Sequence, residues 1–473
     1  MTAALVSMLL PLFTGLLMLL LHQRSGWLVI FSSAASLIAA ALALQEVVYN
    51  SDQLLQLGGW QGPLAIHFHL MPVSALLLFF TALIHLLTAL YAQGSRHSHV
   101  NADYWPLSCL LHGSMAALWL SSDLFNWYIT LELLGLVAVA LVAQAGASAY
   151  GPALRYLILS LAGSLCYLLG VALLYGHYGM LDIVLLAQQT RADHTTLIAL
   201  ILMTLGLMLK AALWPLHMWL PAAHANAPTA VSALLSALVV KGPLFILWLL
   251  WSELAPPELG RPAGFVMAVT GIIALIYGGW AALRAPLLKV LVAYSTVAQL
   301  GYALLALGLL LYWQKPELHV ALWLFVLAHG LAKVSMFLSA GEMQYALGSK
   351  RVSVMRGASQ TMPVAMFAFA VAGGSLIGLP PSGGFLAKWL LLQPLFTEPA
   401  HWPWALGIVV GTLASAAYVF RAVALSFGQA RPARPDFDPD MTGQWLTLLP
   451  ALLVWGMALI SNGLITWMTG VST

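Results

Sequence analysis

The sequence predicts an all-α polytopic membrane protein. Hydrophobic residues make up 62% of its 473 positions and charged residues only 7%, whereas soluble domains carry about 25% charged residues. Apolar stretches of about 20 residues, the length of a helix that crosses a bilayer, follow one another along the chain. This composition leaves no room for a soluble domain, and the sequence contains no glycine fingerprint of a nucleotide-binding site.

Fourteen apolar stretches are expected to cross the membrane, the twelfth of them with an interruption. They lie near residues 3–22, 26–48, 70–93, 104–121, 124–145, 152–176, 195–213, 228–252, 263–283, 286–312, 318–347, 362–397, 402–429 and 441–466. We expect the first to be a retained helix rather than a signal peptide, because no basic segment precedes it.

The basic residues divide unevenly between the two sides of these spans. One side holds eleven of the 18 Lys and Arg residues: Arg24, Arg96, Arg155, Arg284, Lys289, Lys350, Arg351, Arg356, Arg421, Arg431 and Arg434. The other side holds Arg191, Arg261 and Lys315, and the remaining four lysines lie inside spans. The positive-inside rule therefore predicts that the larger set faces the cytoplasm and that both termini lie on the opposite side.

Residues 205–243 contain the first interruption of a helix. Pro215 and Pro221 are expected to cut it, because proline removes a hydrogen-bond donor and clashes with the preceding turn. In lipid, such a break persists only where protein or a water-filled cavity covers it. Four ionisable side chains surround the break: Lys210, His217, His224 and Lys241. Ionisable residues are energetically costly at membrane depth, so those that occur there usually serve a function. We therefore predict that this stretch belongs to an ion path.

The second interruption lies within residues 371–393. Four helix-breaking residues stand in mid-span, followed by Lys388; they are Pro380, Pro381, Gly383 and Gly384. One broken hydrophobic segment in each half of the chain is typical of an inverted-repeat transporter with its site at the membrane midplane. The prediction of a repeat rests on these paired breaks, because residue identity does not reveal one.

Glu132 is the acidic residue expected to face these lysines. It lies about nine residues inside its span, where an unpaired carboxylate is unfavourable, so it should meet a cation in the bundle interior. Burial favours the neutral form of a lysine, and a carboxylate neighbour favours its charged form. A contact with Lys210 or Lys241 would therefore make a proton switch; a static ion pair is the alternative. Asp123, at the mouth of the same span, is expected to be an interfacial residue or a helix cap.

His329 and Lys333 form a third candidate group. Their i, i+4 spacing places them on one face of a helix. Since histidine titrates near neutral pH, the pair suits proton relay; a hydrogen-bonded core histidine is the alternative. With Glu132, Lys210, Lys241 and Lys388, these residues make a row of candidates for proton translocation.

The other histidines and the two cysteines carry no predicted chemistry. His67, His69, His97 and His99 fall in loops and are expected to be solvated, and no function is assigned to His85, His112 and His177. Cys109 and Cys166 are expected to be small buried hydrophobic side chains. No set of His, Cys, Asp and Glu has metal-ligand spacing along the chain, so neither a metal site nor a cofactor is predicted.

At these residues the sequence resembles the antiporter-like subunits shared by respiratory complex I, Mrp-type Na+/H+ antiporters and membrane-bound hydrogenases. The matching stretches, in the expected order between about residues 120 and 395, are DLFNWYITLELL, KAALWPLHMWLPAAHANAPTAVSALLSALVVK, LLKVLVAYSTVAQLGY, LAHGLAKVSMFLSAG and GLPPSGGFLAKW. The second of these is highly specific. The DLFN lead-in, the terminal lysine and the chain length look most like the D subunit of Mrp-type antiporters.

The resemblance implies fourteen helices and two inverted five-helix repeats, with broken helices near residues 214–225 and 378–386, around a hydrated charged axis. In the family, the Glu matching Glu132 pairs with the Lys matching Lys210. Protons are relayed by the residues matching Lys241, His329 and Lys333 to the terminal one matching Lys388. The expected division is residues 1–103 (three helices), 104–252 (first repeat), 263–429 (second repeat) and 430–473 (C-terminal helix).

We therefore expect a proton-translocating or cation/proton-exchanging subunit of a multi-subunit complex in a bacterial inner (plasma) membrane, most like an Mrp-type Na+/H+ antiporter. Its partners would be other membrane subunits, the lipid bilayer, protons and, as a further candidate, Na+; no nucleic acid partner and no bond chemistry of its own are expected. The first alternative is a proton-pumping subunit of a complex I-like NADH:quinone oxidoreductase or a membrane-bound hydrogenase. An independent metabolite transporter and a structural scaffold subunit are alternatives of another class.

Overall fold

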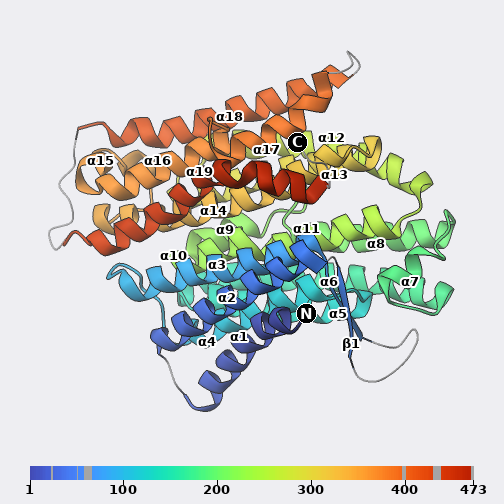
Figure 1. Ribbon diagram of the computed structural model, residues 1–473. Coiled ribbons are helices and arrows are strands. Elements are labelled where there is room, and N and C mark those ends of the chain that lie inside the picture. The colour runs from blue at the N-terminus through green and yellow to red at the C-terminus, as the bar shows by residue number, and fades with distance from the viewer. Residues whose placement is uncertain (23–24, 51, 58–65, 397–400, 430–437, 470–473) are drawn as a thin grey trace. The chain divides into compact units, whose positions relative to one another are not determined.

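The computed structural model describes residues 1–22, 25–50, 52–57, 66–396, 401–429 and 438–469. They form a mostly helical, polytopic membrane fold (Figure 1). Within these residues, eleven helices are long and apolar enough to cross a membrane, which confirms an integral membrane protein. Three arginines of the predicted cytoplasmic set lie outside the described residues: Arg24, Arg431 and Arg434.

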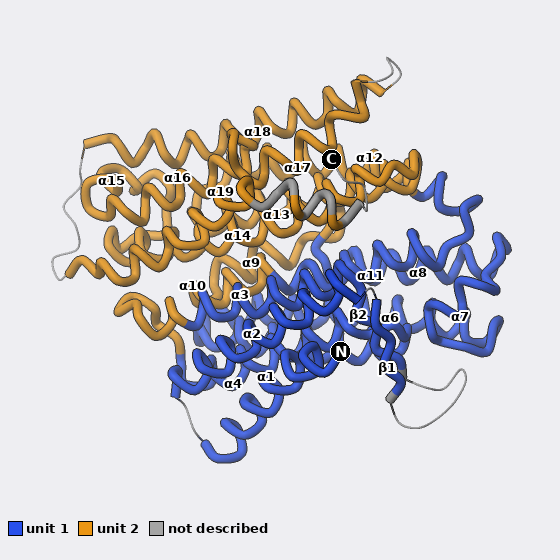
Figure 2. Tube along the Cα trace, viewed as in Figure 1, with its two compact units in different colours: residues 1–89, 101–212, 238–263 blue, residues 90–100, 213–237, 264–473 orange. Residues whose placement is uncertain are grey.

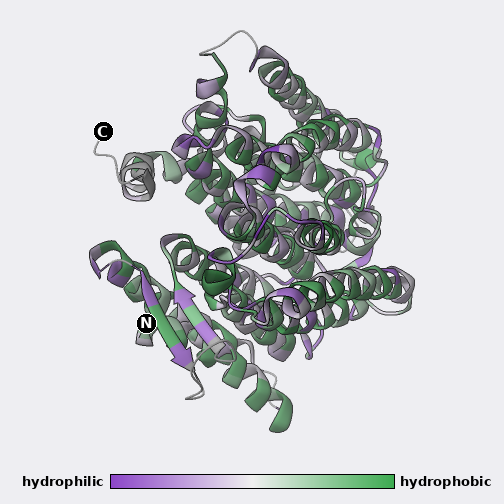
Figure 3. Ribbon diagram, turned by 90° about the vertical axis from the view of Figure 1, so that its right-hand side faces the viewer, coloured by the Kyte–Doolittle hydropathy of each residue, from purple (hydrophilic) through white to green (hydrophobic). Residues whose placement is uncertain are grey.

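Each of the predicted spans has a helical counterpart, although not every counterpart is long. Three of them have fewer than 18 residues: α4 (Tyr104–Leu120), α8 (His194–Lys210) and α16 (Pro363–Ile377). Fourteen membrane crossings therefore stay a prediction. Hydrophobic residues dominate the helices, whereas hydrophilic stretches are more frequent in the connections and in a β-hairpin (Figure 3). That hairpin pairs β1 (Gln53–Leu57) antiparallel with β2 (Ile66–Leu70), so that Gln53 lies opposite Leu70.

The chain forms two compact units (Figure 2). Unit 1 comprises residues 1–89, 101–212 and 238–263, and unit 2 comprises residues 90–100, 213–237 and 264–473. Besides the hairpin, α4 and α8, unit 1 contains α1 (Thr2–Leu20), α2 (Gly26–Asn50), most of α3 (Pro72–Gly94), α5 (Leu124–Ala143), α6 (Ala147–Tyr178), α7 (Ile183–Ala187), α11 (Lys241–Leu249) and the π-helical η2 (Leu250–Leu254).

Small residues bring the helices of unit 1 close together. Helix α6 packs along α8, and α5 packs against both α4 and α6. At the α6–α8 crossing, a Cβ atom on Gly206 would lie 2.3 Å from the Gly163 carbonyl oxygen and 2.8 Å from the Tyr167 backbone nitrogen. Because that crossing is a contact of backbone with backbone, it sets the position of α8, whose last residue is Lys210.

Unit 2 is built around one buried helix, α14 (Pro316–Leu347), which packs against α13, α16, α17 and α19. The other elements of this unit are α9 (Leu220–Asn226), α10 (Thr229–Leu234), most of α12 (Pro257–Arg284), α13 (Leu288–Trp313), the 3-10 turns η3 (Val352–Val354) and η4 (Gln393–Phe396), α15 (Ala358–Thr361), α17 (Gly383–Leu392), α18 (Trp402–Ser426) and α19 (Met441–Thr469). The π-helical η1 (Leu235–Val239) leads from α10 into α11 of unit 1.

Replacing Gly206 with alanine should lower the thermal unfolding temperature of the detergent-solubilised chain. The added methyl group has no space at the α6–α8 crossing, and overpacking of this kind costs about 1–3 kcal/mol. Gly176→Ala in α6 is the matched control, since a Cβ there meets nothing within 4 Å. It should leave the unfolding temperature unchanged or raise it slightly, because alanine is the better helix former. Equal unfolding temperatures for both variants would contradict this packing.

Candidate functional site

Glu132 on α5 and Lys210 on α8 form an ion pair inside unit 1. The Lys210 ammonium donates a hydrogen bond to the Glu132 carboxylate at 2.9 Å. Two serines of α6 complete the network: Ser164 donates its hydroxyl hydrogen to Glu132, and Ser160 accepts a bond of 3.2 Å from Lys210. The Lys210 side chain is 5% exposed and that of Glu132 is 21% exposed. The predicted pairing of Glu132 with a lysine is therefore present, with Lys210 as the partner.

Aspartate caps hold the first turns of the two helices that carry this pair. Asp123 accepts hydrogen bonds from the backbone N–H groups of Phe125 and Asn126, at the start of α5, so of its two predicted roles it takes that of a helix cap. Asp193 accepts a bond from the Thr196 N–H at the start of α8. Burial raises the pKa of Asp123, whereas the Thr196 N–H lowers the pKa of exposed Asp193 to about 2. Both caps satisfy helix donors that would otherwise lack partners.

A small cavity adjoins Lys210 and extends toward the segment around Lys241. Its lining includes Gly135, Tyr156 and Ser160, as well as Val239 and Pro243, which flank Lys241 in the sequence. Lys241 is 1% exposed and opens α11 directly after the π-helical turn η1. Since π-helical turns often mark functional sites, this arrangement supports the choice of Lys241 as a candidate. Glu132, Lys210 and Lys241 thus lie together in unit 1.

The first helix break begins where α8 ends at Lys210. Pro215 lies in the non-helical stretch that follows, whereas Pro221 lies in the first turn of α9. Two histidines of this region pack against aromatic rings of unit 2. The His217 ring meets Tyr277 edge-on with centroids 5.1 Å apart, and the His224 ring stacks on Phe337 at 4.6 Å. Each histidine ring therefore packs against an aromatic ring of the same unit.

His329 and Lys333 lie on α14, in the buried core of unit 2. Their side chains are 2% and 0% exposed. The Lys333 ammonium donates to the carbonyl oxygen of Val292 at 3.0 Å and to the Ser295 hydroxyl, both on α13. The His329 ring lies parallel to that of Phe325, one turn earlier on the same helix. The two residues lie on one face of α14, as predicted. The bonds that Lys333 donates to Val292 and Ser295 both go to neutral oxygen atoms.

Lys388 binds the carboxyl end of the helix that precedes the second break. Its ammonium donates to the carbonyl oxygens of Leu376 at 2.8 Å and Ile377 at 3.0 Å, the last residues of α16. It also lies 4.3 Å from the centre of the Tyr302 ring and 3.4 Å from the Thr412 hydroxyl. A cation is favourable at this end of a helix, where the dipole and the unpaired carbonyl groups are negative.

Glycines allow α17 to begin in close contact with the end of α16 at the second break. Gly378 ends α16 with a φ of 93°, a left-handed conformation that suits glycine. A Cβ on Gly384 would lie 1.9 Å from the Ser375 carbonyl oxygen, so only glycine fits there. Pro380 and Pro381 lie in the break itself, whereas Gly383 and Gly384 form the first turn of α17.

Two residues that were expected in solvated loops are buried. His97 is 8% exposed, and its Nδ1 atom hydrogen-bonds the Glu342 carboxylate at 2.6 Å. It lies in a loop as predicted, but the prediction that it is solvated is wrong, whereas His99 is exposed. The loop prediction is wrong for His67 and His69, which lie half-buried in β2. Lys289, counted among the charges of a cytoplasmic loop, is 6% exposed and donates to the Ala227 carbonyl oxygen at 3.0 Å. Nothing in the adjacent sequence signals either contact, because the partners are far away along the chain.

Unit 1 also contains a pair of histidines to which the sequence analysis assigned no function. The Nδ1 atoms of His85 on α3 and His112 on α4 lie 3.2 Å apart, and the Ser33 hydroxyl of α2 lies 2.8 Å from His85 Nδ1. Both histidines are 0% exposed. Their spacing of 27 residues carries no sequence signal, since only the packing of the first four helices brings them together.

Comparisons with known proteins agree with this architecture. The family model described as "NADH:quinone oxidoreductase/Mrp antiporter, TM" matches residues 121–415. The chain is 32% identical to the N subunit of the NADH-quinone oxidoreductase of Desulforudis audaxviator, over 96% of this chain and 94% of that one. It is 26% identical to the D subunit of the Na+/H+ antiporter of Bacillus subtilis, over 82% and 80% of the two chains.

The fold also matches a solved structure. A chain in the Mrp complex of a Dietzia species superposes with a TM-score of 0.88, covering 99% of this chain and 96% of that chain at 22% identity. The family match covers more than half of the sequence, and the resemblance inferred from five short stretches is confirmed. The chain belongs to the NADH:quinone oxidoreductase/Mrp antiporter transmembrane family.

Proposed function

We propose that this chain is the proton-translocating, or cation/proton-exchanging, subunit of a larger membrane complex. The observation that carries the proposal is the ion pair of Glu132 and Lys210 in the apolar interior of unit 1. A buried pair is a costly way to stabilise a protein, because removing two charges from water offsets most of their attraction. In a member of this family, a buried pair joined to further buried lysines is better explained by movement of protons than by stability.

The pair would act as a switch for Lys210. While Glu132 lies in contact, its charge stabilises the ammonium; when the two separate, burial favours the neutral amine and the proton is released. The hydroxyl groups of Ser160 and Ser164 would then supply hydrogen bonds to the separated groups. We propose that the proton passes to Lys241.

His329, Lys333 and Lys388 would continue the path in unit 2. Lys333 and Lys388 hold their ammonium groups on backbone carbonyl oxygens, which stabilise a cation without neutralising it. Lys388, whose described bonds go to neutral oxygens, can therefore gain or lose a proton without leaving a carboxylate unpaired. Water filling the two helix breaks would connect the steps. The chain itself would carry out no bond chemistry, and any driving reaction would belong to a partner subunit.

The topology we propose has fourteen crossings and two inverted five-helix repeats. Residues 104–252 and 263–429 would form the repeats, preceded by three helices in 1–103 and followed by a C-terminal helix in 430–473. The interrupted helices on either side of Pro215 and within α16–α17 support one break in each repeat. The uneven distribution of Lys and Arg supports both termini outside the cytoplasm, in a bacterial plasma membrane.

Two parent complexes are candidates, and each has an observation in its favour. The Mrp-type motifs and the match to a chain of an Mrp complex support a multi-subunit Na+/H+ antiporter, with other membrane subunits as partners and Na+ as a candidate second ion. The 32% identity to the N subunit of an NADH-quinone oxidoreductase exceeds the 26% identity to the antiporter relative, which favours a redox-driven complex.

Glu132→Gln should abolish most proton translocation without preventing assembly. The amide keeps the shape and the hydrogen bond to Ser164 but removes the charge that stabilises the Lys210 ammonium. A neighbouring opposite charge changes a protonation equilibrium by about 10- to 1,000-fold, so flux should fall at least about tenfold. Proton uptake by the complex reconstituted in liposomes with a pH-sensitive dye measures this effect.

Glu258→Gln is the matched control for that experiment, since Glu258 is exposed in the first turn of α12. It should leave proton uptake unchanged. A native gel reports the amount of assembled complex. If Glu132→Gln reduced assembly and left the flux per complex intact, the pair would be a structural one and the chain a scaffold.

Lys388→Met should stop proton translocation and also destabilise the second break. The thioether fills similar space but leaves the Ile377 carbonyl group without this donor, and it removes one of the two donors of Leu376, whose oxygen also accepts Gln299 Nε2 at 3.3 Å. Each unsatisfied buried group costs about 1–3 kcal/mol. Flux and thermal unfolding temperature should therefore both fall. Lys315→Met, in the loop before α14, should change neither. Wild-type flux in the Lys388 variant would remove this residue from the path.

Gentle detergent extraction of the complex should separate the two parent complexes. Co-purification of small membrane subunits alone would support the antiporter assembly. Iron–sulfur subunits that handle quinone or hydrogen would support the redox-driven pump. A chain that emerged alone, stable and active would contradict the subunit proposal and support an independent transporter.

A further inference from the structure

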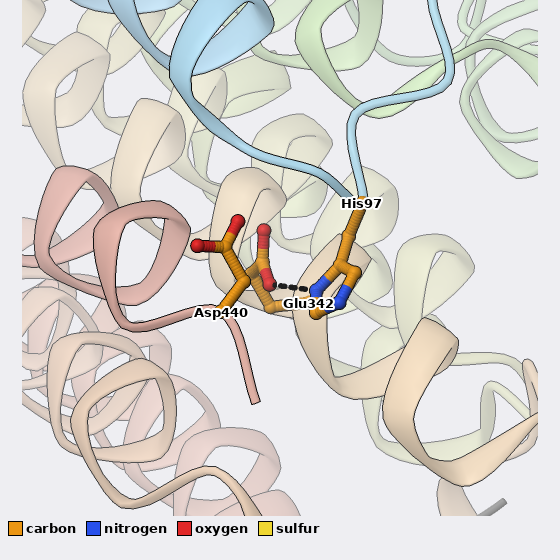
Figure 4. Close-up of side chains that lie close together, drawn as sticks. All are labelled: His97, Glu342 and Asp440. Carbon is orange, nitrogen blue, oxygen red and sulfur yellow. Dashed lines mark hydrogen bonds and ion pairs between the residues drawn. The ribbon is translucent and has the colours of Figure 1, made fainter. Parts of the chain in front are cut away.

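Three potential metal ligands meet in unit 2, and none of them belongs to the proposed proton path. They are His97 in the loop after α3, Glu342 near the end of α14, and Asp440 just before α19 (Figure 4). One ligand atom from each residue lies within 4.8 Å of the other two. The three residues are 8%, 0% and 5% exposed, respectively. Buried imidazole and carboxylate groups converging from three distant segments differ from the acidic clusters that are common on protein surfaces.

A surrounding set of hydrogen bonds orients the two carboxylates. Glu342 Oε1 accepts bonds from the Tyr91 hydroxyl at 2.8 Å and the Ser95 hydroxyl at 2.7 Å. Asp440 Oδ2 accepts the Arg96 backbone N–H at 2.8 Å. The remaining Glu342 oxygen bonds the Nδ1 atom of His97 at 2.6 Å. Outer hydrogen bonds of this kind are usual around metal ligands, whose orientation they determine.

Gly443 leaves space beside both carboxylates. A Cβ on this residue would lie 2.8 Å from Asp440 Oδ2, 2.8 Å from Glu342 Oε1 and 2.7 Å from the Ser95 hydroxyl oxygen. A single point in the first turn of α19 is therefore within contact distance of three oxygen atoms, two of them on the carboxylates of Glu342 and Asp440, and any side chain would fill it. The absence of a side chain at this point lets the two carboxylates lie close to the first turn of α19.

We propose that His97, Glu342 and Asp440 bind a divalent transition-metal ion, for which Zn2+ is the probe. Two adjacent buried carboxylates are unfavourable unless a cation accompanies them. One imidazole nitrogen and two carboxylate oxygens are ligands that Zn2+ accepts, with water in the fourth position. Mg2+ and Ca2+ prefer sites made of oxygen alone. On metal binding, His97 Nδ1 would turn its lone pair to the ion instead of bonding Glu342.

The site has a route for the ion and a structural consequence. His97 lines an open cavity of about 410 Å³, together with Gln344, Tyr345 and two lysines, Lys289 and Lys350. A bound ion would join the loop after α3 to α14 and to the start of α19. Metal binding should therefore stabilise unit 2. This inference does not depend on the proposed role in proton translocation, and either can fail without the other.

Zn2+ binding to the chelator-treated, detergent-solubilised full chain tests the site. The wild-type chain should bind Zn2+ in equilibrium dialysis and gain thermal stability on addition of the ion. His97→Gln should weaken that binding at least about tenfold, because loss of even an outer partner of a metal ligand costs 10- to 100-fold. His194→Gln, at an exposed histidine of unit 1, is the matched control and should bind as the wild type does. Excess Mg2+ should not compete.

A second variant and a spectroscopic measurement identify the ligands of the bound ion. Should His97→Gln fail to fold, Asp440→Asn removes one charged ligand and keeps the shape, and it should show the same loss. X-ray absorption of the bound Zn2+ should report nitrogen and oxygen ligands at about 2.0–2.2 Å. Equal Zn2+ affinity in the wild type, His97→Gln and Asp440→Asn would mean adventitious binding to exposed histidines and would overturn the proposal.

Discussion

The buried contact between Glu132 and Lys210 is the constraint on which the arrangement of unit 1 depends. Two charges in an apolar helix bundle must meet each other or lose much of the stability of the fold, since an unpaired buried charge costs several kcal/mol. The small residues of the α6–α8 crossing bring α8 close enough for Lys210 to reach across α6 toward α5. The serine hydroxyls of α6 then satisfy the bonding capacity that the ion pair leaves open.

The buried ammonium groups of the lysines in unit 2 are stabilised by a different kind of partner. Lys289, Lys333 and Lys388 each donate to backbone carbonyl oxygens, at 3.0 Å, 3.0 Å and 2.8 Å respectively. A carbonyl dipole stabilises an ammonium group less than a carboxylate does. An interrupted helix supplies the carbonyls that hold Lys388, which connects that break directly to the chemistry of the charged group.

The buried polar clusters also divide by kind. One consists of lysines and a carboxylate within predicted spans, and its members belong to stretches that resemble those of the family. The other kind contains histidines from separate segments: His85 lies beside His112, and His97 lies beside the carboxylates of Glu342 and Asp440. The absence of metal-ligand spacing along the chain says nothing about this second kind, because its spacing exists only in three dimensions.

Much of the fold could be predicted from the sequence, because the position of a membrane-spanning helix depends mainly on the residues within that helix. Each apolar stretch must satisfy its own backbone hydrogen bonds, so length and composition are enough to place a helix. Prolines and glycines located the breaks for an equally local reason. The helix boundaries differed mostly by a few residues, because helix ends depend on caps such as Asp193. The π-helical turn before Lys241 had no distinct signal.

The candidate residues Glu132, Lys210, Lys241, His329, Lys333 and Lys388 were identifiable from sequence alone, because a charge inside an apolar span is conspicuous wherever it occurs. Their partners were not. Lys210 rather than Lys241 bonds Glu132, Lys388 binds the end of α16, and His97 is buried against Glu342. Sequence determines which charges enter the membrane, since burial cost depends on composition within one helix. Only the tertiary structure decides which groups meet, since that depends on how distant helices cross.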